Sequence, residues 1–276
     1  MKRPVLLIFV ISIMTGIAAC SDRPEDDFLP EEDTIPAHLR IGYPVQTRII
    51  AHRGYWNTKG SAENSLTALD KAAEEGFYGS EFDVRLTADS IPIIFHDDRI
   101  QNFVIETTPY ARLRDIRLQN GERIPTLQQY LDRGKGRNIQ LILEVKAHRQ
   151  PETDLKAVAT VVSMVRDMDM EEQVDYISFS FPICREILRL LPGAAVSLCG
   201  NVPPSKLKET GITGIDYSYE VLKKYPEWIQ EAKDAGMTVN VWGVNDLRMM
   251  YDFILHDVDF ITTDKPATLK RMLAPY

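Results

Sequence analysis

Cysteine is scarce in this sequence, with three residues among 276: Cys20, Cys184 and Cys199. That number is too small for a disulfide framework in a chain of this length, so the fold must be stabilised by an apolar core instead. We expect Cys184 and Cys199 to pack as small apolar side chains.

An excess of basic residues is also missing. The net charge is −8, and it becomes −10 once Lys2 and Arg3, the only charged residues among the first twenty, are removed. A protein this acidic lacks the electrostatic surface with which nucleic-acid-binding proteins hold phosphates, so we expect no nucleic acid as a partner. A small anionic substrate would need a local cationic site or a bound metal ion.

The apolar run near the N-terminus is short. It covers residues 5–14, follows Lys2 and Arg3, and falls below the length of a typical membrane span, as in a bacterial export signal. Residues 17–20, Ile-Ala-Ala-Cys, resemble a lipoprotein box, in which the cysteine is acylated and becomes the new N-terminus. We therefore expect residues 1–20 to be a lipoprotein signal peptide, and acylated Cys20 to anchor the protein to a bacterial membrane, on the periplasmic side or at the cell surface. Plain secretion and an uncleaved anchor are the alternatives.

Residues 21–47 show no periodic pattern of apolar residues. They contain seven acidic residues and four prolines, a composition that favours an extended and solvated segment. We predict a tether here, followed by one domain over residues 48–276. That length, in a chain with 44% apolar residues, is enough to bury a single large core.

Strand-like segments alternate with helical ones from residue 48 onward. Eight such units are the number in a (β/α)₈ TIM barrel, an α/β fold whose functional groups gather at the carboxyl ends of the strands. The predicted strands are residues 48–52, 80–84, 140–146, 174–179, 194–198, 214–217, 238–244 and 260–263. The predicted helices are residues 64–75, 126–134, 152–168, 182–191, 204–209, 226–235, 246–256 and 266–273.

One apolar segment, residues 91–95, does not fit this alternation. Too few residues separate it from the preceding strand for the crossover that parallel strands require. Residues 87–90, Thr-Ala-Asp-Ser, are typical of a hairpin turn instead. We therefore expect a β-hairpin after the second strand, which would place Asp83 opposite His96 at the mouth of the barrel.

Three carboxylates lie at the ends of the second and third predicted strands. Glu81 and Asp83 are two residues apart, so a strand puts both side chains on one face, and Glu144 lies in the next strand. Like charges brought together would raise one another's pKa values, and a divalent cation would remove that cost. Because all three ligands are oxygen atoms, the pattern favours one Ca²⁺ or Mg²⁺ ion over zinc. The alternative is that these acids only form ion pairs with Arg53 and Lys146.

The order of short motifs along the chain resembles the glycerophosphodiester phosphodiesterase family. The usual pattern there is HRG, PENT, E-x-D-V and HD, followed by E-x-K. The corresponding motifs here are HRG (52–54), AENS (62–65), EFDV (81–84), HD (96–97) and EVK (144–146). Ala62 and Ser65 are mild departures near a helix start, where Asn and Ser are good caps. The resemblance extends from residue 49 to about residue 266, nearly the whole predicted mature chain.

The resemblance implies roles for individual side chains. Glu81, Asp83 and Glu144 match the family's metal positions. His52 and His96 are expected to act as general acid and general base, since imidazole titrates near neutral pH, and which of them takes which role is open.

Cationic and aromatic residues complete the predicted site. Arg53 can grip two phosphate oxygens and Lys146 acts as a point charge, with ion pairs to the neighbouring acids as the alternative. Trp242 lies in residues 240–245, NVWGVN, which resemble the family's NVWTVN. We expect Trp242 to be a wall of the substrate pocket, with core packing as the alternative. His148 shares its strand face with Lys146, so it either lines the mouth or lies on the surface.

The function implied by the resemblance is metal-dependent hydrolysis of a glycerophosphodiester to sn-glycerol 3-phosphate and an alcohol. A phospholipase D-like hydrolase of lysophospholipid or sphingomyelin is one alternative. A non-catalytic, lipid-anchored binding protein on the same barrel is the other. The alcohol head group, the metal, the membrane leaflet and the oligomeric state are open at this stage.

Overall fold

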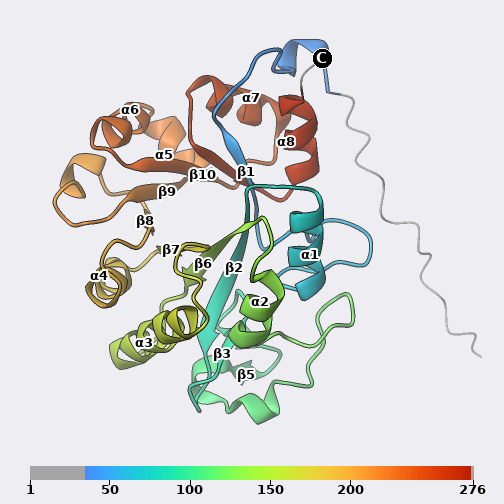
Figure 1. Ribbon diagram of the computed structural model, residues 1–276, viewed down its shortest axis with the longest axis vertical. Helices are drawn as coiled ribbons and strands as arrows, with labels where there is room; N and C mark the ends of the chain where they lie inside the picture. Colours follow the sequence, from blue (N-terminus) through green and yellow to red (C-terminus); the bar gives the residue numbers. More distant parts are fainter. Residues whose placement is uncertain (1–34, 275–276) are drawn as a thin grey trace, which may run out of the picture. The chain divides into compact units, whose positions relative to one another are not determined.

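The computed structural model describes residues 35–274. Within them, eight parallel strands form a closed barrel in the order β1-β11-β10-β9-β8-β7-β6-β2, and β2 completes the ring by pairing with β1 (Figure 1). The (β/α)₈ barrel expected from the sequence is confirmed. Its strands are β1 Arg48–Ala51, β2 Gly79–Leu86, β6 Gln140–Val145, β7 Val174–Ser178, β8 Val196–Cys199, β9 Gly214–Ser218, β10 Thr238–Trp242 and β11 Phe260–Thr263.

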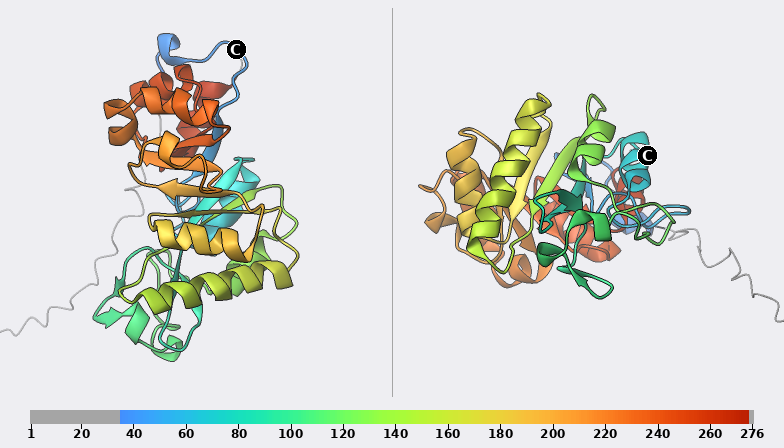
Figure 2. Two further views of the ribbon diagram at one scale, coloured as in Figure 1. Left: turned by 90° about the vertical axis from the view of Figure 1, so that its left-hand side faces the viewer. Right: turned by 90° about the horizontal axis from the view of Figure 1, so that it is seen from below.

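The helices of the described chain lie outside the strands (Figures 1 and 2). The predicted helix at residues 204–209 is only the short 3₁₀ turn η4 (Pro204–Lys206), and α5 is an addition to the predicted set. No described helix is long and apolar enough to cross a membrane. The α-helices are α1 Leu66–Glu74, α2 Leu127–Gly134, α3 Pro151–Asp167, α4 Phe181–Leu190, α5 Tyr219–Lys224, α6 Glu227–Asp234, α7 Leu247–Leu255 and α8 Pro266–Leu273.

Side-chain caps fix where several helices begin. A side-chain oxygen at the N-cap accepts a hydrogen bond from a backbone N–H of the first turn, which satisfies a donor that the helix itself leaves free. These caps set the path of the loops that leave the strand ends, where the site residues lie. The capping residues are Ser65, Thr126, Ser180, Ser218 and Asp246, at the starts of α1, α2, α4, α5 and α7.

Two apolar clusters form the core of the barrel. The larger one fills the space between the strands and the helices, and the smaller one lies inside the barrel around Ile50, Ile142 and Phe260. Cys184 belongs to the outer cluster and Cys199 to the inner one, and both are buried free thiols, as the sequence predicts. Side chains along a strand alternate in direction, so the next residue that faces the barrel interior lies two positions closer to the strand's carboxyl end. These inward-facing positions lie beyond the inner apolar cluster and can carry polar groups.

The hairpin after the second strand is confirmed. β2 extends past its barrel partners and pairs in antiparallel fashion with β3 (Pro92–Ile94), and the Thr87 hydroxyl closes the turn by accepting a hydrogen bond of 3.0 Å from the Ile91 N–H. The predicted register is wrong by one residue, because the Asp83 carbonyl accepts from the N–H of Phe95 rather than facing His96. The observed pairs, such as Leu86 with Pro92, are symmetric about Asp89, whereas the predicted partners Asp83 and His96 are six and seven residues from it.

The hairpin and the chain after it form a small lobe, residues 87–125, which we call the hairpin lobe (Figures 1 and 2). It contains short strands β4 (Arg99–Ile100) and β5 (Phe103–Val104) and the 3₁₀ turns η2 (Ile105–Thr107) and η3 (Tyr110–Arg112). Its own apolar cluster consists of Ile93, Ile100, Ile105, Leu113 and Ile124. The lobe therefore has an independent core beside the barrel mouth.

The packed part of the chain starts earlier than the predicted tether boundary at residue 47. Ile35, Leu39 and Ile41 are buried in the outer core, and the Ile41 N–H donates to the Met272 carbonyl at 3.0 Å. These apolar residues are separated by polar residues and prolines and form no regular hydrophobic pattern. Their burial comes from contacts with distant parts of the chain, so the local sequence does not predict it. The predicted signal peptide and residues 21–34 lie outside the described residues.

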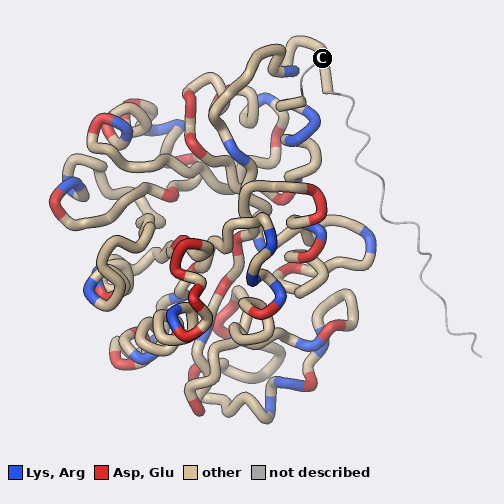
Figure 3. The backbone as a smooth tube through the Cα atoms, in the orientation of Figure 1, with Lys and Arg blue, Asp and Glu red and all other residues tan. Residues whose placement is uncertain are grey.

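Charged residues of both signs are interspersed over the described chain (Figure 3). Several form surface ion pairs, for example Asp70 with Arg133 at 2.7 Å and with Arg137 at 2.9 Å. The positive charge that an anionic substrate requires is therefore local, and it lies at the mouth of the barrel with Arg53 and Lys146.

Candidate active site

The strand ends bring the predicted site residues to one mouth of the barrel. His52 follows the last residue of β1, Glu81 and Asp83 lie on β2, and Glu144 lies on β6. Asp83 and Glu144 are direct partners in the β2–β6 register, so strand pairing alone sets them side by side. This is the end of the barrel at which TIM-barrel enzymes carry their active sites.

A tight turn after β1 directs the backbone N–H of Arg53 toward the carboxylates. Arg53 and Gly54 both have positive φ, 52° and 77°, and the Arg53 N–H donates to Glu81 Oε2 at 2.7 Å. A Cβ added to Gly54 would lie 2.7 Å from the Cβ of Ala68 on α1. Gly54 is therefore required both for the left-handed turn and for the close approach of α1.

The three carboxylates form one buried group. One oxygen from each of Glu81, Asp83 and Glu144 lies within 4.8 Å of the others, and the three residues are only 4%, 1% and 7% exposed. Burial, together with the charge of Asp83, raises the pKa of Glu81 to about 8 and the pKa of Glu144 to about 7. Burial also opposes ionisation of Asp83, but the charges of Lys146 and His96 and the Asn64 amide outweigh it and hold the pKa of Asp83 below its usual value. Crowded acids of this kind are typical of a cation site.

Asn64 holds Asp83 in place. Its side-chain amide donates to Asp83 Oδ2 at 2.8 Å, and its carbonyl oxygen accepts from the Asp83 N–H at 3.1 Å. The sequence indicated capping residues at this turn, and Ser65 does cap α1 by accepting from the Ala68 N–H at 3.0 Å. Asn64, with a φ of 60°, instead has a positioning role that the local sequence did not predict.

Lys146 and Arg53 partly balance the negative charge of the carboxylates. The Lys146 ammonium lies 2.9 Å from Glu144 Oε1 and 3.2 Å from Asp83 Oδ1. The Arg53 guanidinium bonds Glu63 at 2.6 Å, while its buried Nε has no hydrogen bond within the described residues and lies 3.7 Å from Asp83 Oδ2. The ion pairs that the sequence left as an alternative are therefore present.

His52 belongs to a hydrogen-bonded group whose members come from the loops that follow the first strand of the barrel and its last two strands. Its Nδ1 lies 2.7 Å from Asp264 Oδ1, and Asp264 also accepts from the Trp56 indole at 3.1 Å and from the Asn245 amide at 2.6 Å. Burial alone would lower the pKa of His52, but the bond to Asp264 and the charge of Glu81 outweigh it and raise that pKa.

The contact of Asp264 with His52 is the main feature of the site that sequence reasoning missed. Asp264 directly follows β11 and lies two residues before α8, and no residue near it in the sequence indicates a histidine partner. It meets His52 because β11 pairs with β1. Burial would raise its pKa, but the hydrogen bonds from His52, Asn245 and Trp56 lower it to about 2. The strand order of a closed barrel, in which the last strand meets the first, is the signal that could have indicated the pair.

His96 reaches the same mouth from the hairpin. Its carbonyl accepts from Arg85 Nε at 2.8 Å, which fastens the returning chain to β2, and its Nδ1 lies 2.7 Å from Asp97 Oδ1. Its side chain is 39% exposed. Burial lowers the pKa of His96 below the usual value, and the charge of Asp83 only partly offsets this effect.

A cavity of about 120 Å³, which we call the inner cavity, lies over the carboxylates. Trp242 lines it, with its ring 5.9 Å from that of Phe179 in an edge-to-face arrangement. The Trp242 indole nitrogen is buried without a hydrogen bond in the described chain. His52, Arg53, Glu81, His96, Glu144 and Lys146 also line this cavity.

His148 is the one candidate that lies elsewhere. Its Nε2 accepts from the Leu86 N–H at 3.0 Å, and its Nδ1 lies 3.0 Å from Asp154 Oδ1. Both ring nitrogens are therefore engaged, and the side chain is only 2% exposed. This histidine joins β2 to the start of α3, away from the inner cavity, so it is neither at the mouth nor on the surface.

Comparisons with known proteins agree with this arrangement. The model of the glycerophosphoryl diester phosphodiesterase family matches residues 52–268. A glycerophosphodiester phosphodiesterase of Caldanaerobacter subterraneus subsp. tengcongensis is 26% identical over 247 residues, which cover 82% of this chain and 97% of that protein.

Solved structures are similar over the same part of the chain. The crystal structure of a glycerophosphodiester phosphodiesterase from Parabacteroides distasonis is 47% identical with a TM-score of 0.82, covering 84% of this chain and 98% of that one. A phosphodiesterase of Oleispira antarctica in complex with the product sn-glycerol-3-phosphate has the same fold, with a TM-score of 0.70 and 24% identity over 82% of this chain and 96% of that one. The protein therefore belongs to the glycerophosphoryl diester phosphodiesterase family and is a phosphoric diester hydrolase.

Proposed function

We propose that the protein hydrolyses glycerophosphodiesters to sn-glycerol 3-phosphate and an alcohol by metal-dependent acid–base catalysis. The observation that carries this proposal is the meeting of two histidines over one buried carboxylate group: His52 and His96 both line the inner cavity, as do Glu81 and Glu144. Membership of the family and the name of the Parabacteroides distasonis relative support the substrate class.

Glu81, Asp83 and Glu144 are the proposed ligands of one Ca²⁺ or Mg²⁺ ion. The fit rests on the donor set, which is three carboxylates within 4.8 Å, and on the raised pKa values of the two glutamates, a cost that a cation would remove. When bound, a divalent cation would supply positive charge to the phosphate oxygens and polarise the phosphoryl group.

The cationic and aromatic side chains of the site are proposed to bind the phosphate and the glycerol group of the substrate. Arg53 and Lys146 both line the inner cavity beside the carboxylates, where their cationic groups would bind phosphate oxygens. Both would stabilise the charge that builds on phosphorus during the reaction. Trp242 and Phe179 form the wall of the inner cavity, whose volume of about 120 Å³ suits a group as small as glycerol.

The positions of the two histidines suggest which is base and which is acid. Of the inner cavity and the larger one next to it, His52 lines the inner one alone. The Asp264 bond at Nδ1 leaves Nε2 as the atom that accepts a proton from the nucleophile, either water or the substrate's own glycerol hydroxyl. His96 lines both this cavity and the larger one next to it, so it stands on the side where the alcohol leaves. As the new P–O bond forms and the old one breaks, His96 would give its proton to the leaving alkoxide.

Two other functions remain as competing proposals. A phospholipase D-like hydrolase of lysophospholipid or sphingomyelin would use the same site, but it needs room for acyl chains. A non-catalytic binding protein on this barrel would keep affinity for the phosphodiester without turnover, and the presence of both histidines and all three acids speaks against it.

For the location of the enzyme, we propose attachment to a bacterial membrane through acylated Cys20, on the periplasmic side or at the cell surface. The support is the signal-like sequence of residues 1–20. Such an anchor would keep the catalytic barrel close to the membrane from which glycerophosphodiesters arise when acyl chains are removed.

Replacement of each histidine tests the mechanism. In His52→Ala and in His96→Ala, kcat on a natural glycerophosphodiester should fall by about 10²–10⁴-fold. A substrate that leaves as p-nitrophenolate needs no protonation, so it should restore turnover in His96→Ala but not in His52→Ala. His256→Ala is the matched control, because this histidine is exposed at the end of α7, and its kcat should be unchanged. Near-normal kcat in both active-site variants would exclude the two-histidine mechanism.

A further inference from the structure

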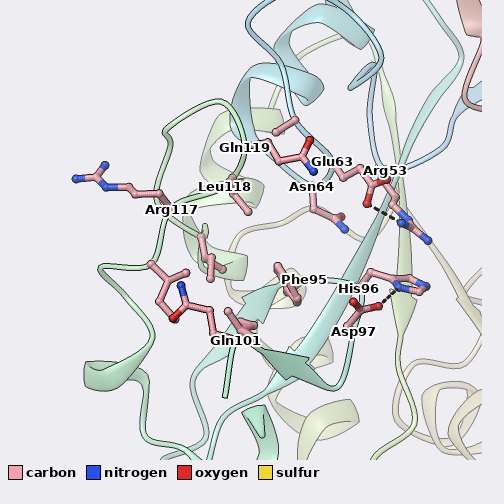
Figure 4. Close-up of a pocket in the computed structure, with 14 residues that line it drawn as sticks. Arg53, Glu63, Asn64, Phe95, His96, Asp97, Gln101, Arg117, Leu118 and Gln119 are labelled. Atoms are coloured by element: carbon pink, nitrogen blue, oxygen red, sulfur yellow. Dashed lines mark hydrogen bonds and ion pairs between the residues drawn. The ribbon is translucent and has the colours of Figure 1, made fainter. Parts of the chain in front are cut away.

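A second and larger cavity adjoins the inner one on the side of the hairpin lobe (Figure 4). It has a volume of about 350 Å³, nearly three times that of the inner cavity. Arg53 and His96 line both cavities, so a phosphodiester held between these two residues has one ester arm on each side. We call this larger space the outer cavity.

The floor of the outer cavity is apolar. It is formed by the cluster of the hairpin lobe, namely Phe95, Ile100, Ile116, Leu118 and Ile124. Ile100 and Ile124 are fully buried, whereas the other three are half-buried and present part of their surface to the cavity. Such a floor accepts the C–H surface of a ligand without leaving polar groups unpaired.

The rim of the outer cavity has polar groups, and its charged side chains either have a hydrogen-bonding partner in the lining or point away from the cavity. Arg53 is paired with Glu63 at 2.6 Å and His96 with Asp97 at 2.7 Å (Figure 4). Figure 4 also shows the guanidinium of Arg117 directed away from the cavity, and this group donates to the Gly121 carbonyl at 3.1 Å. The lining therefore offers a cationic ligand no carboxylate without a hydrogen-bonding partner, and no guanidinium in it is directed at a second anion.

Two neutral amides remain as recognition groups at the rim. Gln101 and Gln119 are both exposed side chains, and neither forms a hydrogen bond with another of the residues drawn around the cavity (Figure 4). A carboxamide carries two N–H donors and a carbonyl acceptor, which suits it to alcohol hydroxyl groups. An apolar floor with amides at the edge fits a ring that has C–H faces and hydroxyl edges.

We propose that the outer cavity is the subsite for the leaving alcohol, and that it takes a neutral polyhydroxylated alcohol such as a cyclitol or a sugar alcohol. The proposal rests on the proposed glycerophosphodiester hydrolysis and adds to it the chemical class of the alcohol that leaves. A trimethylammonium head group lacks an aromatic cage here, since Phe95 is the only aromatic ring among the described residues that line the cavity.

A panel of four substrates tests this subsite in the purified full-length protein. They are glycerophosphoinositol, glycerophosphocholine, the glycerophosphate methyl ester and lysophosphatidylcholine. The methyl ester is the reference because its leaving group is too small to reach the rim. The expected result is that kcat/KM for glycerophosphoinositol exceeds that for glycerophosphocholine by about tenfold or more.

Two variants link that preference to the cavity. Leu118→Trp should fill the floor, and Gln119→Ala should remove one rim amide. In each, the ratio of kcat/KM for glycerophosphoinositol to that for the methyl ester should fall, by about fivefold for Gln119→Ala. Gln230→Ala, an exposed glutamine on α6, is the matched control and should leave the ratio unchanged.

The outcomes separate this proposal from the one on which it rests. Hydrolysis of the panel with a preference for glycerophosphocholine or lysophosphatidylcholine, or with a ratio that neither variant alters, would overturn the subsite and leave glycerophosphodiester hydrolysis standing. Absence of hydrolysis of every substrate, the methyl ester included, would overturn the proposed function and the subsite with it.

Discussion

Glu81 and Glu144 are buried carboxyl groups whose pKa values lie near neutral pH, at about 8 and about 7. At pH 7 a large part of both groups is therefore protonated in the metal-free protein. Ligation of a cation requires the ionised forms, so binding of Ca²⁺ or Mg²⁺ should release about one proton. Titration calorimetry in two buffers with different heats of ionisation measures this number directly, and a binding heat that is the same in both buffers would contradict the carboxylate site.

The same two groups also make the stability of the metal-free protein depend on pH. Folding raises their pKa values above the ordinary value of 4.5, so the folded state binds more protons than the unfolded state between about pH 4.5 and 8. The free energy of unfolding should therefore fall as pH rises through this window. Added Ca²⁺ should remove much of that decline, because the cation stabilises the ionised carboxylates.

Asp264 controls the titration of His52. Replacement by Asn removes the charge and the carboxylate hydrogen bond that raise the pKa of His52, so this pKa should fall. In a bell-shaped profile of kcat/KM against pH, the group with the higher pKa sets the alkaline limb, and here that group is His52. Asp264→Asn should shift the alkaline limb to lower pH and reduce kcat. A limb that stays in place would show that the pair does not titrate as described.

Among the local elements, the turn between β1 and α1 fixes the geometry of the site, and two glycines in it provide a matched test. Gly54 and Gly60 have nearly equal φ values, 77° and 74°, but only Gly54 lies against α1. Gly60→Ala should cost about 1–2 kcal/mol for the left-handed backbone alone. Gly54→Ala should cost a further 1–3 kcal/mol or so from the clash with Ala68, and it should displace the Arg53 N–H from Glu81. Equal unfolding free energies and full activity in both variants would contradict this account.

The elements differ in how well the sequence predicts them. Alternation of apolar runs and turn residues is a local property, which is why the eight barrel strands and the β2–β3 hairpin were predictable. The hairpin register was wrong by one residue, because the predicted partners Asp83 and His96 are six and seven residues from Asp89, about which the observed pairs are symmetric. Segments packed by distant contacts were missed, such as residues 35–41 against α8.

Site residues follow the same rule. Glu81, Asp83 and Glu144 lie at strand ends, so strand periodicity and barrel topology are enough to bring them together. Asp264 reaches His52 only because the barrel closes on itself, and Asn64 reaches Asp83 through a left-handed turn. Neither contact has a signature in the neighbouring sequence.

At the scale of the whole molecule, membrane attachment through Cys20 remains a prediction from the sequence. Cys20→Ala should prevent acylation and release the protein from the membrane fraction, whereas its activity on a soluble glycerophosphodiester should be kept, because the barrel contains the complete site. Phase separation of a detergent extract measures the effect. Partition of the unaltered protein into the aqueous phase would contradict the lipid anchor.

The central claim, metal-dependent hydrolysis of glycerophosphodiesters at this barrel mouth, is tested most directly by product analysis before and after removal of divalent cations. The purified protein is incubated with a glycerophosphodiester, and sn-glycerol 3-phosphate is measured in untreated, chelator-treated and Ca²⁺- or Mg²⁺-restored samples. The account predicts one sn-glycerol 3-phosphate per alcohol released, loss of turnover after chelation, and recovery with one of the two ions. Full activity in the metal-free protein, or phosphate retained on the alcohol instead of on glycerol, would contradict it.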